Sequence, residues 1–586
     1  MTELYFGPFY EQVRLFVTGE SIFRLECVYY SVYIFFSALF FLTIYSGFLN
    51  VSQGFYREPY RKKIDLFLIS GVLLLFFLKS LTFYQDHLNP DEGMLLTASI
   101  NMIYDPRPWV SADATTLGPA SYLIVNLFAA VGKLFGGNGF ITYFLCRVVL
   151  TFLVISTFII LYKVLLKNIS VAMARIISFL YILFFATSLE NMEINAYNTE
   201  YVYILCFIIC IYYIFHIRKH QSQFALIIAG ISAGIFPYIK LQTAPIMLSV
   251  IAWMFYSIYY SHMYSNTSKN HWFKSMALYS IAIILPTVLL VSYLSAYNGL
   301  GRAYFFYISN AADHISAIDT VFFRRFLELS HVFLRHRSSI QIILVILVSC
   351  YFCLWYNKSL SLDHVFAFIT VFVAIFVLMR PLRGSPHYII FVSMPAFIFL
   401  MLSLKAVEAN PDTESWKKFK VFYPMLFGFL GVWIIISSPM EYLQHSLNMT
   451  RAGFVTRETE TNKTLTNIIL KNTHPADPIL VWGWAMQFHV YTNRPSATAQ
   501  SNIERILGHY SKENIDIFIR QIKKNKPKLI IDAVSPSSWM FYDENVLAIS
   551  KHNAVWNAIK DDYTLEKVIP DRGGSIKVYA REPLRE

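Results

Sequence analysis

The sequence predicts a multi-pass α-helical membrane protein with a small extracytoplasmic α/β domain at its C-terminal end. Three observations lead to this fold class. Hydrophobic residues make up 56% of the 586 residues and charged residues only 15%, whereas a soluble domain carries about 25% charged residues. Apolar stretches long enough to cross a bilayer recur up to residue 438. Beyond that point, short apolar runs alternate with amphipathic, charged stretches.

Twelve apolar stretches are predicted to cross the membrane, because each offers the run of about 20 residues that a bilayer requires. They lie at 28–48, 64–83, 139–166, 171–188, 199–217, 222–238, 241–260, 276–297, 340–356, 363–379, 387–406 and 420–438. We therefore divide the chain into three parts: an N-terminal segment with one extra span (1–63), a transmembrane core (64–438) with a large outer loop (84–138), and a separate C-terminal domain (439–586).

Loop charges predict the orientation, since cytoplasmic loops are rich in Lys and Arg. Alternate loops carry basic residues and should face the cytoplasm: Arg57, Arg61, Lys62, Lys63, Lys163, Lys167, Arg175, Arg218, Lys219, Lys405, Lys417, Lys418 and Lys420. The outer side then receives the loop 84–138, the turns 189–198 and 380–387, the segment 298–339 and everything after residue 438. Five arginines fall on this outer side against the rule, and either a function in a surface helix or a different topology would explain them: Arg302, Arg324, Arg325, Arg335 and Arg337.

The C-terminal part has the alternation of strands and helices that is typical of a small α/β domain. Strands are predicted near 479–483, 528–532, 563–569 and 575–580, and an amphipathic helix with a basic end near 514–526. This part contains no glycine-rich phosphate-binding motif. The net charge of +12 is best explained by basic cytoplasmic loops and anionic lipid. We expect no nucleic-acid partner, because no basic patch is interleaved with aromatic residues.

The acidic pair Asp91-Glu92 opens the large outer loop directly after an apolar span. Carboxylates at a membrane surface are costly to desolvate and are usually functional. Neighbouring residues point in different directions, so one carboxylate could take a proton from an acceptor hydroxyl while the other orients a sugar or binds a cation. The alternative is structural, because acids after Pro90 also suit a helix N-terminus.

A second acidic segment, the outer turn 190–200, is dense in carboxylates and amides. Glu190, Glu193 and Glu200 are candidates to line a polar site that binds sugar or acceptor, and Asn198 lies among them. Helix capping by Asn198 or Thr199 is the structural alternative.

Three outer positions offer cations that suit a phosphate group. Lys240 lies in a tight turn after Pro237, and Arg147 lies near the outer end of a span, where snorkelling to lipid headgroups is the alternative for both. The turn 380–388 brings together Arg380, Arg383, His387 and Tyr388, and arginine binds phosphate oxygens bidentately. Acids and cations from at least four outer turns would therefore meet at one membrane face. A substrate with both a phosphate and a lipid tail would suit such a site.

These motifs resemble the GT-C superfamily of integral-membrane glycosyltransferases, in particular the bacterial branch that includes aminoarabinose transferases and protein O-mannosyltransferases. The resemblance covers most of residues 64–586. It rests on the order and spacing of short motifs: Asp91-Glu92, Gly118-Pro119, Arg147, Asn198-Thr199-Glu200, Lys240-x-Gln242, Arg380 with His387-Tyr388, and Leu480-Val481-Trp482-Gly483.

The resemblance implies an inverting transfer of a hexosyl or pentosyl group from a polyprenyl-phosphate donor to an acceptor hydroxyl. It implies that Asp91 is the general base, with Glu92 beside it. Sugar or acceptor would be bound by Glu190, Glu193, Asn198, Glu200, His387 and Tyr388, and the lipid phosphate by Arg147, Lys240, Gln242, Arg380 and Arg383. Some members use a divalent cation (Mg²⁺, Mn²⁺ or Zn²⁺), for which Glu92, Glu200 and His387 are the candidate ligands, but no cofactor is certain.

Two other function classes use similar features. A lipid-linked-saccharide transporter or flippase would place charges inside spans and often has repeated halves, neither of which stands out here. A surface-polysaccharide polymerase or ligase uses the same donors and is poorly separated by sequence. We expect a monomer in a bacterial inner membrane, with its site facing the periplasm and with a lipid, glycan or protein as acceptor. A secretory signal peptide is not apparent.

Overall fold

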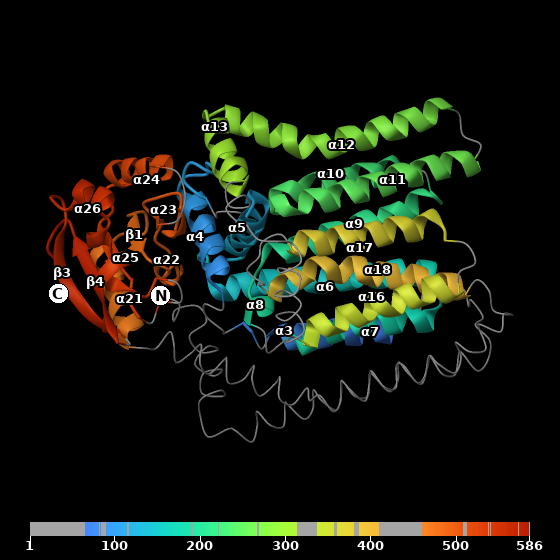
Figure 1. The fold of residues 1–586 in the computed structure, drawn as a ribbon, viewed down its shortest axis with the longest axis horizontal. Helices are drawn as coiled ribbons and strands as arrows, with labels where there is room; N and C mark the ends of the chain where they lie inside the picture. Colours follow the sequence, from blue (N-terminus) through green and yellow to red (C-terminus); the bar gives the residue numbers. More distant parts are fainter. Residues whose placement is uncertain are drawn as a thin grey trace, which may run out of the picture.

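The protein is mostly helical, with a small sheet in its C-terminal part (Figure 1). The computed structural model describes residues 65–80, 82–83, 89–113, 117–188, 192–220, 222–265, 269–312, 337–356, 360–379, 386–408, 460–507, 512–536, 538, 541–571 and 573–584. The extra N-terminal span 28–48 and the last predicted span, 420–438, lie outside these residues. The other ten predicted spans fall on described helices.

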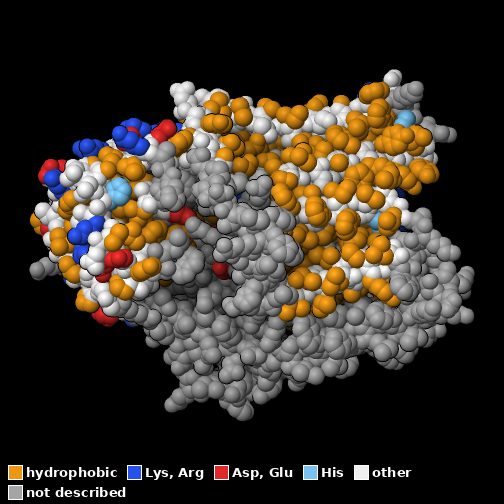
Figure 2. Space-filling view, in the orientation of Figure 1, with side chains coloured by type: hydrophobic (Ala, Val, Ile, Leu, Met, Phe, Trp, Pro, Cys, Tyr) orange, Lys and Arg blue, Asp and Glu red, His pale blue; other side chains and the backbone are white. Residues whose placement is uncertain are grey.

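These ten helices lie side by side in a bundle (Figure 1). They are α3 (Leu66–Ser80), α6 (Tyr143–Asn168), α7 (Val171–Thr187), α9 (Thr199–Ile217), α10 (Gln223–Ile239), α11 (Ala244–Ser265), α12 (Lys269–Ser295), α16 (Arg337–Tyr356), α17 (Leu362–Met379) and α18 (Ile389–Glu408). Among the described residues, six helices are long and apolar enough to cross a membrane. Figure 2 shows hydrophobic side chains over the bundle and charged ones over the C-terminal part. The chain is thus a multi-pass membrane protein, as predicted.

The outer loop folds into two helices, α4 (Pro90–Tyr104) and α5 (Pro119–Leu134). Each begins with a proline at the first helical position, where the missing N–H costs nothing. The helix α5 is amphipathic: Tyr122 and Val125 are buried, whereas Leu127 and Leu134 are exposed. Such a helix suits a position along a membrane surface.

Short helical turns join the spans at the end of the bundle that faces these loop helices. They are α8 (Met192–Asn195), η1 (Leu241–Thr243), α13 (Leu300–Ala303), η2 (Tyr304–Ser309) and η3 (Pro386–Tyr388). All lie in or directly beside turns and segments that the sequence places on the outer side. Predicted site residues from distant parts of the chain therefore lie at one end of the bundle.

The C-terminal part has one four-stranded sheet with strand order β1-β2-β4-β3. Strands β1 and β2 are parallel, and the other two pairs are antiparallel. The strands, β1 (Ile479–Trp482), β2 (Leu529–Asp532), β3 (Thr564–Asp571) and β4 (Gly574–Ala580), fall where the sequence predicted them. Around them lie α21 (Glu460–Asn472), α22 (Gln487–Thr492), α23 (Glu504–Leu507), α24 (Lys512–Asn525), α25 (Glu544–Leu547), η4 (Ile549–Lys551) and α26 (Asn553–Ile559).

The C-terminal domain contacts the outer loop directly. The Asp113 amide donates to the Ala499 carbonyl (2.9 Å), and the Asn493 side chain both accepts from and donates to the backbone of Ile141 (2.8 and 2.9 Å). Met94 of α4 belongs to the hydrophobic core of this domain. The domain therefore lies against the helix that carries the acidic pair.

Candidate active site

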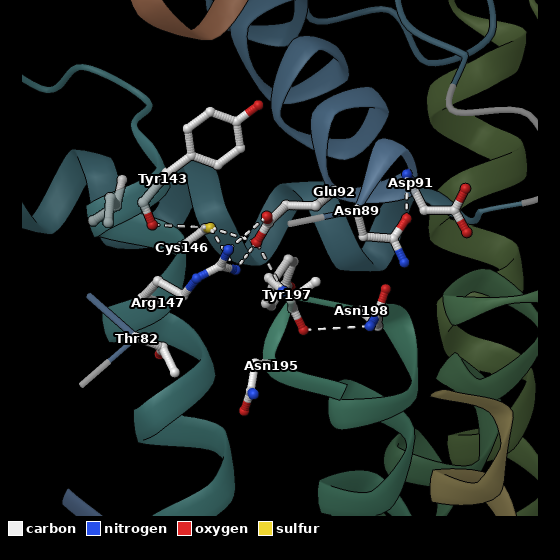
Figure 3. A network of polar contacts seen from close by, with 12 residues as sticks. Thr82, Asn89, Asp91, Glu92, Tyr143, Cys146, Arg147, Asn195, Tyr197 and Asn198 are labelled. Carbon is white, nitrogen blue, oxygen red and sulfur yellow. Dashed lines mark hydrogen bonds and ion pairs between the residues drawn. The ribbon is translucent and has the colours of Figure 1, made fainter. Parts of the chain in front are cut away.

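The acidic pair lies in the first turn of α4, where local sequence sets its geometry. The Asn89 side chain caps the helix by accepting a hydrogen bond from the Asp91 amide (2.8 Å). Asp91 and Glu92 leave this turn in different directions, and Figure 3 shows them pointing apart. The structural alternative, a helix N-terminus, is therefore present, and each carboxylate has its own surroundings.

Glu92 is wholly buried and its carboxylate is saturated with donors. Both terminal nitrogens of Arg147 contact it, Nη2 at 2.8 Å from Oε2, and the Tyr197 amide donates to Oε1 (2.8 Å). The Cys146 thiol lies 3.1 Å from the same oxygen. Arg147 is likewise 0% exposed. Glu92 was predicted to act in catalysis and Arg147 to bind a lipid phosphate, but here they are paired with each other. A structural role in joining α4 to α6 fits this geometry better.

Lys79 is a buried cation that the sequence analysis missed. Its ammonium donates to Asn195 Oδ1 (3.2 Å) and lies over the Phe185 ring (5.0 Å). Asn195 in turn donates to the Ser188 carbonyl (3.2 Å). A single lysine inside an apolar run, as in Leu78-Lys79-Ser80, is the signal that could have identified it.

The surroundings of Asp91 are of another kind. Asp91 is half-buried, and its carboxylate has no hydrogen bond or ion pair with any described residue. Lys240, His387 and Glu200 lie near enough to influence its charge. Burial, the largest effect, raises the pKa of Asp91 above its ordinary value, whereas His387 and Lys240 act to lower it. Asp91 therefore has a carboxyl group that lacks hydrogen-bond partners among the described residues and binds a proton more readily than an ordinary aspartate.

The groups near Asp91 form a chain of alternating charge. Lys240 Nζ lies 2.9 Å from Glu200 Oε1, and both side chains are 1% exposed. His387 Nε2 lies 3.9 Å from that same oxygen, while His387 Nδ1 lies 2.9 Å from Glu193 Oε2. The Tyr388 ring lies 4.3 Å from Lys240 Nζ, so it can hold the ammonium by a cation–π contact. Five of the predicted residues thus meet in one cluster beside Asp91.

Both cations of this cluster favour their charged forms. Burial acts to lower the pKa of Lys240, but the Glu200 carboxylate outweighs it, and the pKa lies above its ordinary value. Burial also acts to lower the pKa of His387, but Glu200 and Glu193 together outweigh it and raise the pKa of the imidazole above its ordinary value. The cluster therefore presents a lysine ammonium, and an imidazole whose protonation Glu200 and Glu193 favour, next to a carboxyl that is unpaired among the described residues.

A close backbone approach holds Lys240 in place. Leu117 forms an isolated β-bridge with Lys240, and the Gly118 amide donates to the Ile239 carbonyl (2.8 Å). A Cβ at Gly118 would lie 2.1 Å from the Tyr238 carbonyl oxygen. Only glycine fits here, which gives the Gly118-Pro119 motif a physical reason: the outer loop must touch the end of α10.

The remaining predicted residues have varied surroundings. Asn198 precedes α9 but makes no side-chain cap; its amide donates instead to the carbonyls of Glu193 and Ala196, so it shapes the acidic turn. Gln242 is half-buried, and its Oε1 has no hydrogen-bond partner among the described residues. Glu190, Arg380 and Arg383 lie outside the described residues. Their roles, and those of Asn198 and Gln242 in binding, stay predictions.

The proposed metal ligands are not brought together as a metal site. Among the described residues, no group of three His, Cys, Asp or Glu side chains could hold a metal ion. Glu92 holds Arg147, whereas Glu200 and His387 lie in the other cluster, where Lys240 already supplies positive charge. The set Glu92, Glu200 and His387 does not fit a divalent cation, and metal dependence through other residues stays a prediction.

The C-terminal domain adds one more carboxylate. Asn502 Nδ2 contacts Met94 Sδ (2.6 Å), one turn along α4 from Asp91, and Asn502 Oδ1 accepts from the Glu504 amide (3.2 Å). The charge of Glu504 also acts to raise the pKa of Asp91. Glu504 was not predicted from the sequence, because no local signal distinguishes it from other surface acids.

Comparisons with known proteins identify the fold. No protein-family model and no curated protein matches the sequence. Among solved structures, the chain is similar to ArnT from Cupriavidus metallidurans bound to undecaprenyl phosphate, with 12% identity and a TM-score of 0.51 over 88% of this chain and 97% of that one. The chain has the GT-C fold.

A second similar structure is the oligosaccharyltransferase from Archaeoglobus fulgidus in the apo form, with 12% identity and a TM-score of 0.43 over 90% of this chain and 75% of that one. The GT-C fold that the sequence predicted is therefore confirmed by the comparison with ArnT. At this identity the comparison establishes the arrangement of the helices and not the reaction, so the function must be argued from the site.

Proposed function

We propose that this protein is an inverting glycosyltransferase. It would move a hexosyl or pentosyl group from a polyprenyl-phosphate donor to an acceptor hydroxyl at the periplasmic face of a bacterial inner membrane. This proposal rests on the surroundings of the Asp91 carboxyl. That carboxyl has no hydrogen bond or ion pair with the described residues, yet it lies beside a buried ammonium and an imidazole. Such an arrangement suits a base that faces a leaving anion.

Each part of the cluster has a role in this reaction. Asp91 takes the proton of the acceptor hydroxyl, and that oxygen attacks the anomeric carbon of the donor sugar from the side opposite the phosphate. The bond between the anomeric carbon and the phosphate oxygen breaks, and the polyprenyl phosphate leaves with the electron pair. Lys240 and protonated His387 stabilise its developing negative charge. A single displacement of this kind inverts the anomeric configuration.

The remaining contacts position these groups. Glu200 holds Lys240, Glu193 holds His387, and Tyr388 lies against the ammonium. The bundle supplies apolar surface along which a polyprenyl chain could lie (Figure 2). The structure of ArnT contains undecaprenyl phosphate, which supports a lipid-linked donor for a protein of the same fold.

The test is a transfer assay with purified protein in lipid nanodiscs. Undecaprenyl-phosphate sugars are offered together with envelope extract as the acceptor source, and released undecaprenyl phosphate is measured. Asp91→Asn should lower kcat about 10²–10⁴-fold, because a positioned general base contributes that much. Its affinity for undecaprenyl phosphate should stay unchanged. The matched control is Asp561→Asn, an exposed acid of the C-terminal domain, which should retain full activity.

Two results would contradict the proposal. Full activity of Asp91→Asn would show that Asp91 is not the base. Equal binding of undecaprenyl phosphate and undecaprenol by the wild-type protein would show that the protein does not recognise the phosphate of a lipid-linked donor.

A further inference from the structure

At the junction of the outer loop, α13 and α24, two arginines lie near enough to a third, Arg302, to influence its charge. Arg107 follows α4, Arg302 lies in α13, and Arg520 lies in α24. Arg302 is one of the outer arginines that the positive-inside rule does not explain. The proposed transfer reaction uses none of the three.

The junction that carries them is well packed. The Trp109 and Tyr307 rings lie 5.2 Å apart, and both belong to a hydrophobic cluster that includes Ile517 of α24. Gln521, next to Arg520, donates to the Val110 carbonyl (2.9 Å). These contacts hold the loop, the end of α12 and the helix α24 in fixed relative positions, so the three arginines are held near one another.

A pair of amides completes the junction. Asn310 and Asn514 exchange hydrogen bonds between their side chains (3.2 and 3.3 Å), and both residues are buried. The link joins the segment after α13 to the first turn of α24. The aromatic cluster and this pair of amides together hold the segments that carry the three arginines next to one another.

The positive charge of this cluster is only partly compensated. The Arg107 guanidinium forms a bidentate ion pair with Asp105, in which Nε and Nη2 each lie 2.6 Å from a carboxylate oxygen. Neither Arg302 nor Arg520 has an ion pair with any described carboxylate. Burial, followed by the charges of Arg520 and Arg107, lowers the pKa of Arg302. A guanidinium stays protonated at neutral pH nonetheless. The guanidinium groups of Arg302 and Arg520 are therefore both available to bind an anion.

Exposed apolar side chains lie in the same segments as these arginines. Tyr293, at the end of α12, is 44% exposed, and Leu300 and Tyr304, which flank Arg302, are 41% and 66% exposed. The helix α12 is a candidate span with a largely exposed apolar surface, including Leu289. The arginines therefore lie near the end of a candidate span, where basic side chains can reach lipid headgroups.

We propose that Arg302 and Arg520, with Arg107 beside them, bind the phosphate of an anionic lipid whose acyl chains lie along α12. The lipid belongs to the leaflet on the side of the C-terminal domain. Arginine forks match phosphate oxygens bidentately, and the aromatic and aliphatic side chains at the end of α12 accept the glycerol and upper acyl region. This binding site is separate from the Asp91 cluster and does not depend on the transfer reaction.

The test measures lipid binding to the full protein in a neutral detergent by native mass spectrometry. The probes are dihexanoyl phosphatidic acid, dihexanoyl phosphatidylcholine and inorganic phosphate. The wild-type protein should bind the phosphatidic acid in preference to the other two. The double variant Arg302→Gln/Arg520→Gln should bind it at least about tenfold more weakly, since bonds to charged groups are worth that much.

Three further variants make the test specific. Arg302→Lys/Arg520→Lys keeps the charge but loses the bidentate geometry, so its affinity should lie between those of the wild type and the double glutamine variant, which excludes misfolding as the cause of the loss. Arg581→Gln removes an exposed arginine after β4, outside the junction, and should bind normally. Asp91→Asn should also bind normally, which separates this site from the proposed transfer site.

Three results would overturn the proposal. The double glutamine variant could bind phosphatidic acid as well as the wild type does. Arg581→Gln could weaken binding to the same extent, which would indicate attraction by surface charge alone. Inorganic phosphate could bind as tightly as the lipid, which would indicate an anion site without a lipid component.

Discussion

Asp91 and Glu92 are adjacent acids in one turn of α4, yet they lie in opposite kinds of surroundings. Glu92 is buried and receives Arg147 and the Tyr197 amide. Asp91 is half-buried, and its carboxylate has no such partner among the described residues, although Lys240 and His387 lie nearby. A carboxylate whose lone pairs are all used holds helices together. A carboxylate that lies near cations and still has lone pairs available can exchange a proton with a substrate.

The largest expected effect is on the Glu92 side. Arg147→Met should lower the free energy of unfolding by about 3–5 kcal/mol, because it leaves a buried carboxylate without its counter-ion. Thermal unfolding of the detergent-solubilised protein, followed by tryptophan fluorescence, measures the effect. The double variant Glu92→Gln/Arg147→Met should recover much of the loss, since neither charge is then buried alone. Equal stability of the single variant and the wild type would show that the pair is not structural.

A smaller effect is expected where the outer loop touches Lys240. Gly118→Ala places a Cβ against the Tyr238 carbonyl, so the loop must move away from the Lys240 turn. We expect a loss of stability of about 1–3 kcal/mol, as for other overpacked sites, together with reduced transfer activity. Gly132→Ala is the matched control, because a Cβ at Gly132 of α5 meets no atom within 4 Å. If both variants behave alike, the close approach does not position Lys240.

The smallest effect concerns the pH dependence of transfer. The base must be ionised, so kcat/KM should fall as the pH drops through the pKa of Asp91, which burial raises above the ordinary aspartate value. Glu504 acts in the same direction, so Glu504→Gln should lower this pKa and move the acid limb to lower pH by less than about one unit. The pH–rate profiles of both proteins provide the measurement.

Glu513→Gln serves as the control for that shift, because Glu513 is an exposed acid of α24 and is not among the groups named as acting on Asp91. Its acid limb should coincide with that of the wild type. An unchanged limb in Glu504→Gln would mean that the C-terminal domain does not act on the base.

Much of the fold and part of the site could be predicted from the sequence. The ten described spans were found from their apolar length, and the four strands from short apolar runs between helical segments. Asp91, Glu193, Glu200, Lys240 and His387 were identified because charged residues beside apolar spans are costly. Their meeting at one end of the bundle follows from the alternation of spans and loops.

The partners of these residues could not be predicted in the same way. Arg147 and Lys240 are both cations near the ends of spans, yet the first pairs with Glu92 and the second with Glu200. Lys79 was overlooked because the apolar average of its span conceals a single charge. Glu504 reaches the surroundings of Asp91 only because the C-terminal domain docks on α4, about 400 residues earlier in the chain.

The sequence by itself determined the features that depend on short-range interactions. These are the apolar length of each span, the cap and proline that begin α4 at Asn89 and Pro90, and the glycine that precedes α5. The tertiary structure alone decided which of two adjacent carboxylates is neutralised and which keeps its lone pairs available. The physical reason is that ion pairing and desolvation depend on which helices pack together, and local sequence does not encode contacts between segments so far apart.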